Sequence, residues 1–242
     1  MSDWLRRNPR TAPPAIELGG RVLPVAIRRL VHARRLTLRL APDGSEVRVS
    51  MPRWGQTEEA LAFVRSRSGW LEAQLAAAIR IELVEPGGHF PYRGKLVLVD
   101  HAPGHPRRPE LLDSAIRVGG PAEAVGGRVR RWLEVEARRL ITDDLAHFCR
   151  LAGVAVPSLA LSGAQRRWGS CSAHGRIRIN WRLVMAPDAV RRSVVAHEVA
   201  HLVHFDHSPR FHACLAELFE GDLVAANRWL KREGRRLYGW FG

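Results

Sequence analysis

The sequence has few of the residues that stabilise small secreted proteins or anchor proteins in membranes. Its three cysteines, Cys149, Cys171 and Cys214, are an odd number and form no C-x-x-C pair. Neither a disulfide framework nor a thiolate zinc site is therefore expected. No stretch approaches the ~20 apolar residues of a membrane span, and residues 1–9 lack the apolar run of a signal peptide. We expect a soluble cytoplasmic protein with no membrane partner.

Lysine is almost missing from a strongly basic chain. Only Lys95 and Lys231 are lysines among 38 basic residues, and the net charge is +14 at pH 7. Clustered arginines bind phosphates and gain affinity from counterion release, which leaves nucleic acid open as a partner. The arginines are nevertheless spread along the chain, and a solvated surface explains most of them.

The length and the apolar pattern predict an α+β protein with two regions. A chain of 242 residues with 46% hydrophobic content can bury one sizeable core or two modest ones. Short β-branched runs between residues 22 and 50 predict a small antiparallel sheet, and helical spacing from Thr57 to Leu83 predicts one helix packed on it. We expect residues 1–118 to form an N-terminal β-rich region with one long helix, and residues 119–242 to form the second region.

The second region combines helices with a short sheet. Apolar spacing predicts a long helix over about residues 121–151, and β-branched runs predict strands at 159–162 and 177–181. Pro187 and Asp188 suit a helix start, and this helix continues to about His204. Ser208 as N-cap and Pro209 after it open a helix to about residue 219, and a last helix covers about residues 222–236.

The strongest functional signal is the motif His197-Glu198-Val199-Ala200-His201. Histidines four apart lie on one helix face, with Cβ atoms ~6 Å apart, where both imidazoles can bind one zinc ion. Glu198 is not needed as a ligand, and a carboxylate there can act as general base. The motif predicts a zinc-dependent hydrolase in which a zinc-activated water attacks a peptide carbonyl. A protein or peptide is the expected substrate.

The third metal ligand has several candidates. His204 lies one turn further along the helix, but three ligands on one straight helix would not surround a metal tetrahedrally. His207 lies beyond the expected helix end, so the chain can fold its imidazole back over the metal, and we favour it. A later carboxylate, Glu217 or Glu220, is the other alternative. Three protein ligands would leave a position for catalysis, whereas four would indicate a structural zinc.

Two features separate the motif from the metzincins, which share its H-E-x-x-H-x-x-x-x-x-H spacing. His204 stands where their sharp turn requires glycine. The chain has only Met1, Met51 and Met185, so no methionine follows the motif and a Met-turn cannot form.

Three blocks of sequence between residues 166 and 212 carry a family resemblance. They are Arg167-Trp168-Gly169-Ser170-Cys171-Ser172, then Ile177-Arg178-Ile179-Asn180, and then Val194 to His201 followed by Asp206, His207, Ser208 and Phe211. The chain resembles the YgjP-type metallopeptidase-like family, zincin-like relatives of the SprT and WLM proteases. The resemblance implies zinc held by His197, His201 and His207, with Glu198 as base. It also implies a substrate-binding strand beside the zinc helix, at residues 177–180.

Four residues are candidates for substrate contacts. Trp168 begins a block that we expect to form a tight turn, either packed in the core or bordering the cleft. Asn180 or Arg178 is a candidate to stabilise the oxyanion. His212 stands where the resembled family tends to carry tryptophan, and is either a proton donor or a partly exposed helix residue.

Two other functions stay open at this point. Arginines near the motif, including Arg166, Arg167, Arg191 and Arg192, suggest a nucleotide phosphoanhydride as substrate. The chain has no glycine-rich phosphate loop, which weakens that alternative. The related SprT and WLM groups suggest a protease that acts on protein bound to DNA.

Overall fold

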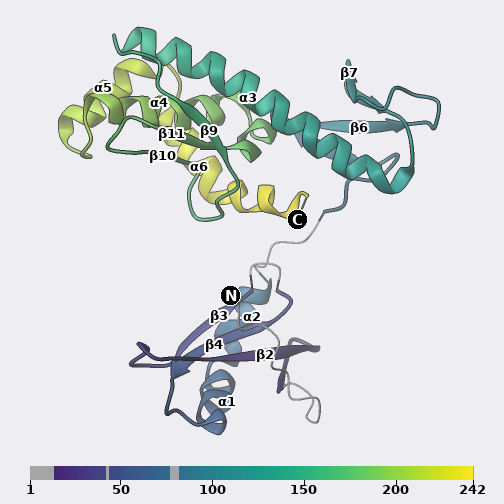
Figure 1. The fold of residues 1–242 in the computed structure, drawn as a ribbon, viewed down its shortest axis with the longest axis vertical. Helices are drawn as coiled ribbons and strands as arrows, with labels where there is room; N and C mark the ends of the chain where they lie inside the picture. Colours follow the sequence, from purple (N-terminus) through teal and green to yellow (C-terminus); the bar gives the residue numbers. More distant parts are fainter. Residues whose placement is uncertain (1–13, 42–43, 77–81, 242) are drawn as a thin grey trace. The chain divides into compact units, whose positions relative to one another are not determined.

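The computed structural model describes residues 14–41, 44–76 and 82–241, and it is a mixed α+β structure (Figure 1). Its contacts divide the chain into two compact units, Met1–Arg80 and Ile81–Gly242. Residues 1–9, which lack a signal peptide pattern, and the last expected turns of the first helix, residues 77–81, lie outside the described residues. Within the described ranges, every helix is too short or too polar to cross a membrane.

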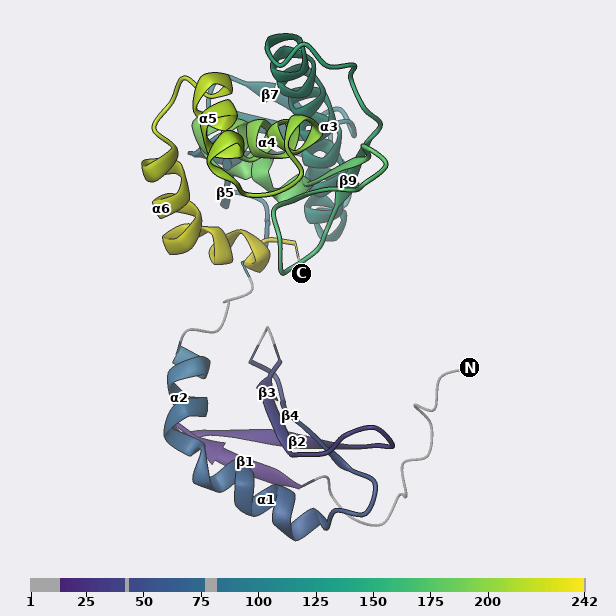
Figure 2. The same ribbon diagram turned by 90° about the vertical axis from the view of Figure 1, so that its left-hand side faces the viewer.

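The first unit packs two helices on one face of a four-stranded sheet (Figure 2). The strands are β1 (Ala15–Leu18), β2 (Arg21–Leu30), β3 (Thr37–Leu40) and β4 (Val47–Pro52), in the order β1-β2-β4-β3. The helices are α1 (Thr57–Ser66) and α2 (Ser68–Ala76). Alternating strand residues such as Val47, Val49 and Met51 are buried against Val64 and Leu71 of the helices. This hydrophobic cluster is the core of the unit.

Two details of the first unit differ from the expectation. The sheet is mixed, because β2 runs parallel to β4 from Val25↔Val47 to Leu30↔Pro52. The expected single helix is interrupted at Arg67, which has φ −114° and ψ 16°. Serines on both sides of Arg67 and the following Gly69 are weaker helix formers than alanine or leucine. The apolar spacing continues across the break because both helices pack on the same sheet.

The second unit contains a sheet within residues 89–118, a range that we expected to belong to the N-terminal β-rich region. Its strands are β5 (His89–Tyr92), β6 (Lys95–His101), β7 (Glu110–Leu112) and β8 (Ala115–Val118), in the order β5-β6-β8-β7. A 3₁₀ turn (Ala122–Ala124) leads into α3 (Val125–Leu151). Phe90 and Ile116 share one hydrophobic cluster with Val129 and Leu133 of α3. The boundary between the compact units therefore falls near residue 80. We had expected the boundary between the two regions at residue 118.

The rest of the second unit contains the elements that carry the motif. A three-stranded sheet has the order β10-β11-β9, with β9 (Leu159–Ser162), β10 (Gly169–Cys171) and β11 (Ile177–Asn180). It is followed by η2 (Trp181–Met185), α4 (Asp188–Val203), α5 (Pro209–Leu218), α6 (Leu223–Glu233) and η3 (Gly234–Gly239). Strands β9 and β11 and all three helices were predicted at these places. The block at 169–171 was expected to be a turn and is a strand instead.

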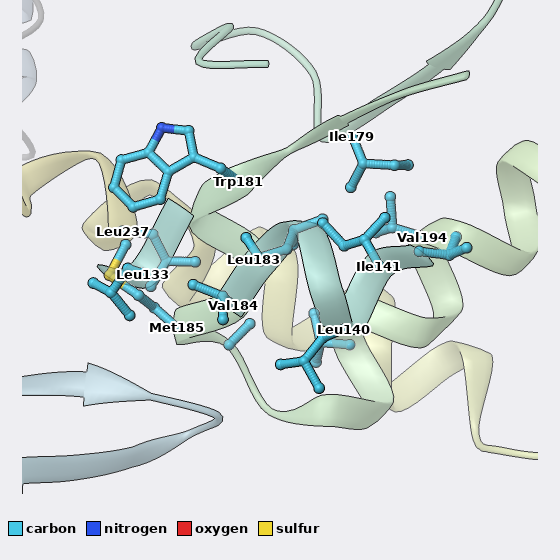
Figure 3. Packing of buried hydrophobic residues seen from close by; sticks show 14 of the residues in the cluster. Leu133, Leu140, Ile141, Ile179, Trp181, Leu183, Val184, Met185, Val194 and Leu237 are labelled. Carbon is cyan, nitrogen blue, oxygen red and sulfur yellow. The ribbon is translucent and has the colours of Figure 1, made fainter. Parts of the chain in front are cut away.

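The motif helix is fixed by a shared core. Figure 3 shows Leu140 and Ile141 of α3, Ile179 of β11 and Val194 of α4 among the side chains of one cluster. Val199 and Ala200 on the motif helix are fully buried in the same cluster. Most residues of α4 around the motif are buried, Glu198 among them, whereas His197 and His201 stay partly exposed.

Candidate active site

Ion pairs hold the start of α4 against α3. The Arg191 side chain is 3% exposed, and its Nε lies 2.7 Å from Oδ2 of Asp144 on α3. The other Asp144 oxygen lies 3.1 Å from a terminal nitrogen of Arg192. Asp188 accepts hydrogen bonds from Arg191 and from Arg93 of the β5–β6 turn. Arg191 and Arg192, which were considered for phosphate binding, therefore both pair with Asp144.

Three imidazoles converge at the other end of α4. His197 and His201 lie one turn apart, with ring centroids 4.8 Å apart. The helix ends at His204, where φ −132° and ψ 109° turn the chain into an extended conformation. This turn brings His207 back, so that one ligand atom from each of His197, His201 and His207 lies within 4.8 Å of the others.

The donor geometry of these histidines fits a metal ion. The Nε2 atoms of His197 and His207 are 3.4 Å apart, and nitrogens bound tetrahedrally to zinc at 2.0–2.1 Å are separated by ~3.3 Å. Nδ1 of His201 lies 3.3 Å from the carbonyl oxygen of His204. If Nδ1 donates to that carbonyl, the ring is oriented and Nε2 is the nitrogen left for a metal.

The protonation of the cluster also suits metal binding. Burial, and after it the charges of the neighbouring imidazoles, lowers the pKa of His197 to about 4. Burial likewise lowers the pKa of His201 below its usual range. Both rings are therefore neutral at pH 7, which is the form that binds a metal.

The composition of the cluster distinguishes a catalytic from a structural site. Over the described residues, the group of potential ligands consists of His197, His201 and His207, and it includes neither His204 nor Glu217 nor Glu220. A structural zinc site has four protein ligands, whereas a catalytic site has three. The three-histidine set thus leaves one coordination position for a water or a substrate.

Glu198 is held in place by strand β10. Glu198 is 5% exposed, and the backbone N–H of Cys171 donates to its carboxylate. A Cβ atom at Gly169 would lie 2.3 Å from Oε1 of Glu198, so the carboxylate occupies space that only a glycine leaves free. Burial raises the pKa of Glu198 to about 7, although the Cys171 hydrogen bond and the charge of Arg167 oppose this increase.

A buried phenylalanine supports all three imidazoles. Phe211 is fully buried, and its ring centroid lies 5.0 Å from that of His197, 4.5 Å from that of His201 and 4.9 Å from that of His207. Helix α5 positions Phe211, because Ser208 caps the helix and its Oγ accepts from the Phe211 N–H at 3.5 Å. Sequence reasoning gave no role to Phe211 or to Gly169, although both lie in the blocks that carry the family resemblance.

The side chains of Asn180 and Trp168 make contacts within the protein. Asn180 is fully buried, and its amide nitrogen donates to the Ala164 carbonyl at 2.8 Å and to the Tyr238 hydroxyl at 3.3 Å. Its side-chain oxygen accepts from the Arg182 N–H at 3.0 Å. Both amide hydrogens are thus used, and none is left for an oxyanion. Trp168 is half-buried and stacks on Tyr238, with ring centroids 4.9 Å apart.

The other two substrate-binding candidates are exposed. Arg178 lies on β11 between the buried Ile177 and Ile179, so its side chain points to the opposite face of the strand. His212 is exposed on α5, and its ring centroid lies 6.5 Å from that of His207. Of these two, His212 contacts the histidine cluster.

The strand expected to bind substrate lies in the middle of its sheet. Strand β11 pairs antiparallel with β10 and parallel with β9, so both of its edges are occupied. Strand β10 is an edge strand, and it contacts α4.

A buried glutamate between two imidazoles of one helix, with a third imidazole from the following loop, defines a metallopeptidase-type hydrolase. A family model described as "YgjP-like, metallopeptidase domain" matches residues 34–233. The chain therefore belongs to the YgjP-like metallopeptidase family, as the sequence blocks at 166–212 predicted, and a metal ion is implied for its site. No curated protein and no solved structure matches the chain.

Proposed function

We propose that this protein is a zinc-dependent peptidase whose metal is held by His197, His201 and His207. One observation above all supports this function: three imidazoles converge beside a buried glutamate, and two of them lie on the same helix as that glutamate. When bound, zinc supplies Lewis-acid chemistry, polarising the scissile carbonyl and lowering the pKa of the attacking water toward ~7.

In this proposal Glu198 transfers the proton of the reaction. Its carboxylate accepts a proton from the water that attacks the peptide carbonyl and then delivers this proton to the leaving amine. The hydrogen bond from Cys171 and the close approach of Gly169 support the role, because they hold the carboxylate in one orientation. The base is thereby placed before the substrate arrives.

Strand β10 is the proposed binding edge for the peptide. Ser170 pairs with Arg178 of β11. Successive residues of a strand direct their backbone N–H and C=O groups to opposite edges, so those of Gly169 and Cys171 point to the outer edge of β10. The donation from the Cys171 N–H to Glu198 agrees with this direction. An extended peptide that adds to this edge would present its carbonyl beside Glu198.

The proposal is tested by comparing the zinc-loaded protein with its Glu198→Gln variant. Unfolded protein and short peptides are one set of substrates, and nucleoside triphosphates are the other. We expect cleavage of peptides by the wild type, and a loss of at least ~10³-fold in the variant at unchanged zinc content. Full activity of Glu198→Gln, or phosphate release from nucleotides without peptide cleavage, would contradict the proposal.

A further inference from the structure

Among the described residues of the first unit, one face of the sheet is covered by no helix, and arginines gather on it. Helices α1 and α2 pack on the other face, where Val47, Val49 and Met51 are buried. Because side chains alternate along a strand, Arg48 of β4, Arg28 of β2 and Arg39 of β3 point to the opposite, exposed face. We call these three residues the arginine face.

The strand register places two of these arginines directly opposite each other. Arg39 of β3 pairs with Arg48 of β4, and Arg48 is paired on its other side with Ala26 of β2. Directly opposed like charges destabilise a sheet. Glu46 offsets part of this repulsion through an ion pair with Nε of Arg48 at 2.6 Å, yet the Arg48 side chain stays 57% exposed. An anionic ligand bound by both guanidinium groups would relieve this repulsion.

Two hydroxyl side chains lie on the same face, in the row of cross-strand partners next to Arg39 and Arg48. Arg28 of β2 lies beside Ser50 of β4, and Ser50 lies beside Thr37 of β3. Guanidinium and hydroxyl groups are the side chains that most often bind phosphate oxygens of nucleic acids. The carboxylates of the helices, Glu58, Glu59 and Glu72, belong to the other layer of the unit. The exposed face of the sheet thus carries Arg28, Arg39 and Arg48, with Glu17 of β1 beside Val22 at the other end of β2.

An exposed tryptophan follows the end of strand β4. Trp54 is 79% exposed, and it lies in a turn closed by the hydrogen bond from the Gly55 N–H to the Pro52 carbonyl at 3.1 Å. Pro52 pairs with Leu30, two residues beyond Arg28 on β2, and the exposed Arg53 precedes Trp54. Large exposed aromatic side chains beside arginines are the stacking positions of proteins that bind unpaired bases.

We propose that this surface binds single-stranded nucleic acid. Arg28, Arg39 and Arg48 contact consecutive phosphates, and the indole of Trp54 stacks on a base. Unpaired bases are required, because the bases of a duplex are already stacked and leave no face for the indole. The inference is independent of the metal site, since every residue that carries it lies in the first unit.

The test measures binding of the full-length, zinc-loaded protein to a fluorescent oligothymidylate of about 20 nucleotides. Fluorescence anisotropy is recorded at several salt concentrations, together with quenching of tryptophan fluorescence. We expect Arg39→Gln/Arg48→Gln to weaken binding by about tenfold or more, and to reduce the slope of log K against log salt by about 1.4. Trp54→Ala should weaken binding by at least about fivefold and remove most of the quenching.

Matched controls separate this surface from general charge. Arg65→Gln/Arg67→Gln removes the same charge from the helical layer of the unit and should leave affinity within about twofold. Glu198→Gln should bind as the wild type does, which keeps this test distinct from the peptidase test. Removing one arginine of the opposed pair should not lower the melting temperature, so loss of binding cannot be ascribed to unfolding.

Three outcomes would overturn the proposal. The first is no binding at low salt. The second is an equal loss of affinity in the control and in the arginine-face variant. The third is tighter binding of a duplex of the same length, because a duplex offers no base to Trp54.

Discussion

Gly169 and Phe211 position the candidate catalytic groups, although neither carries reactive chemistry. The proximity of His197 and His201 could be predicted from the sequence because a helix brings residues four apart to one face. The roles of Gly169 and Phe211 depend on contacts with α4 from other elements, β10 and α5. Such contacts leave no periodic signal in the sequence, which is why these two residues were not predicted. The same holds for Asn180, whose partners Ala164 and Tyr238 are set by the fold.

Replacing Gly169 with alanine should displace the Glu198 carboxylate. The added Cβ would lie 2.3 Å from Oε1 and 2.7 Å from Cγ of Glu198, so this side chain must move. A displacement of about 1 Å reduces catalysis by ~10²-fold. We expect such a loss in kcat/KM for a peptide substrate, with zinc content unchanged. The control is Gly127→Ala on α3, where the nearest atom to the new Cβ is 3.7 Å away, and which should keep full activity.

Phe211→Leu should weaken metal binding without removing a ligand. The ring contacts all three imidazoles, and loss of groups that orient metal ligands typically costs 10- to 100-fold in affinity. Competition with a zinc-binding dye would measure the change. Unchanged zinc affinity in a folded Phe211→Leu protein would show that the imidazoles are positioned without the phenylalanine.

At the scale of elements, strand β10 is the clearest departure from the sequence-based expectation. Gly-Ser-Cys lacks the β-branched residues that mark strands, so a turn was the natural expectation. Pairing with β11 makes it a strand. The reverse applies to residues 57–76, where apolar spacing predicted one helix and the local break at Arg67 gave two. Strands β9 and β11 and helix α4 were predicted correctly because their patterns are local and strong.

The ion pair between α3 and α4 should contribute strongly to stability. Asp144→Asn leaves Arg191, which is 3% exposed, with Asp188 as its remaining acidic partner. Loss of one partner from a buried pair typically costs about 3 kcal/mol in the free energy of unfolding. Urea unfolding followed by circular dichroism measures this change.

The matched control is the neighbouring Asp143→Asn. The Asp143 side chain is 67% exposed and pairs with Arg139 on the same helix, so its loss should change stability by less than about 0.5 kcal/mol. Equal effects of the two variants would mean that the buried pair does not hold α4 on α3.

At the scale of the whole molecule, the described residues form two hydrophobic clusters, one in each compact unit. The sequence predicted two regions but grouped β5–β8 with the first, because a strand pattern shows that a residue is buried without showing in which core. The side chains of β5–β8 bury against α3, which no local pattern could reveal. The match to the YgjP-like family begins at residue 34 and so includes parts of both units.

Removing the metal should affect one unit only. The candidate ligands lie on α4 and in the loop before α5, and a ligand stabilises the state that binds it, by about 2.7 kcal/mol at a concentration 100 times its Kd. Chelation should therefore speed amide hydrogen exchange in α4 and α5, and leave exchange in β4 and α1 unchanged. Equal acceleration in both units would contradict a metal site confined to the second unit.

X-ray absorption at the zinc edge reports the ligands of the bound metal and so examines the three-histidine site itself. We expect about three imidazole nitrogens at 2.0–2.1 Å and one oxygen, with one nitrogen lost in His207→Ala. A sulfur ligand at about 2.3 Å, as Cys171 would give, or a fourth protein ligand that closes the site, would contradict it.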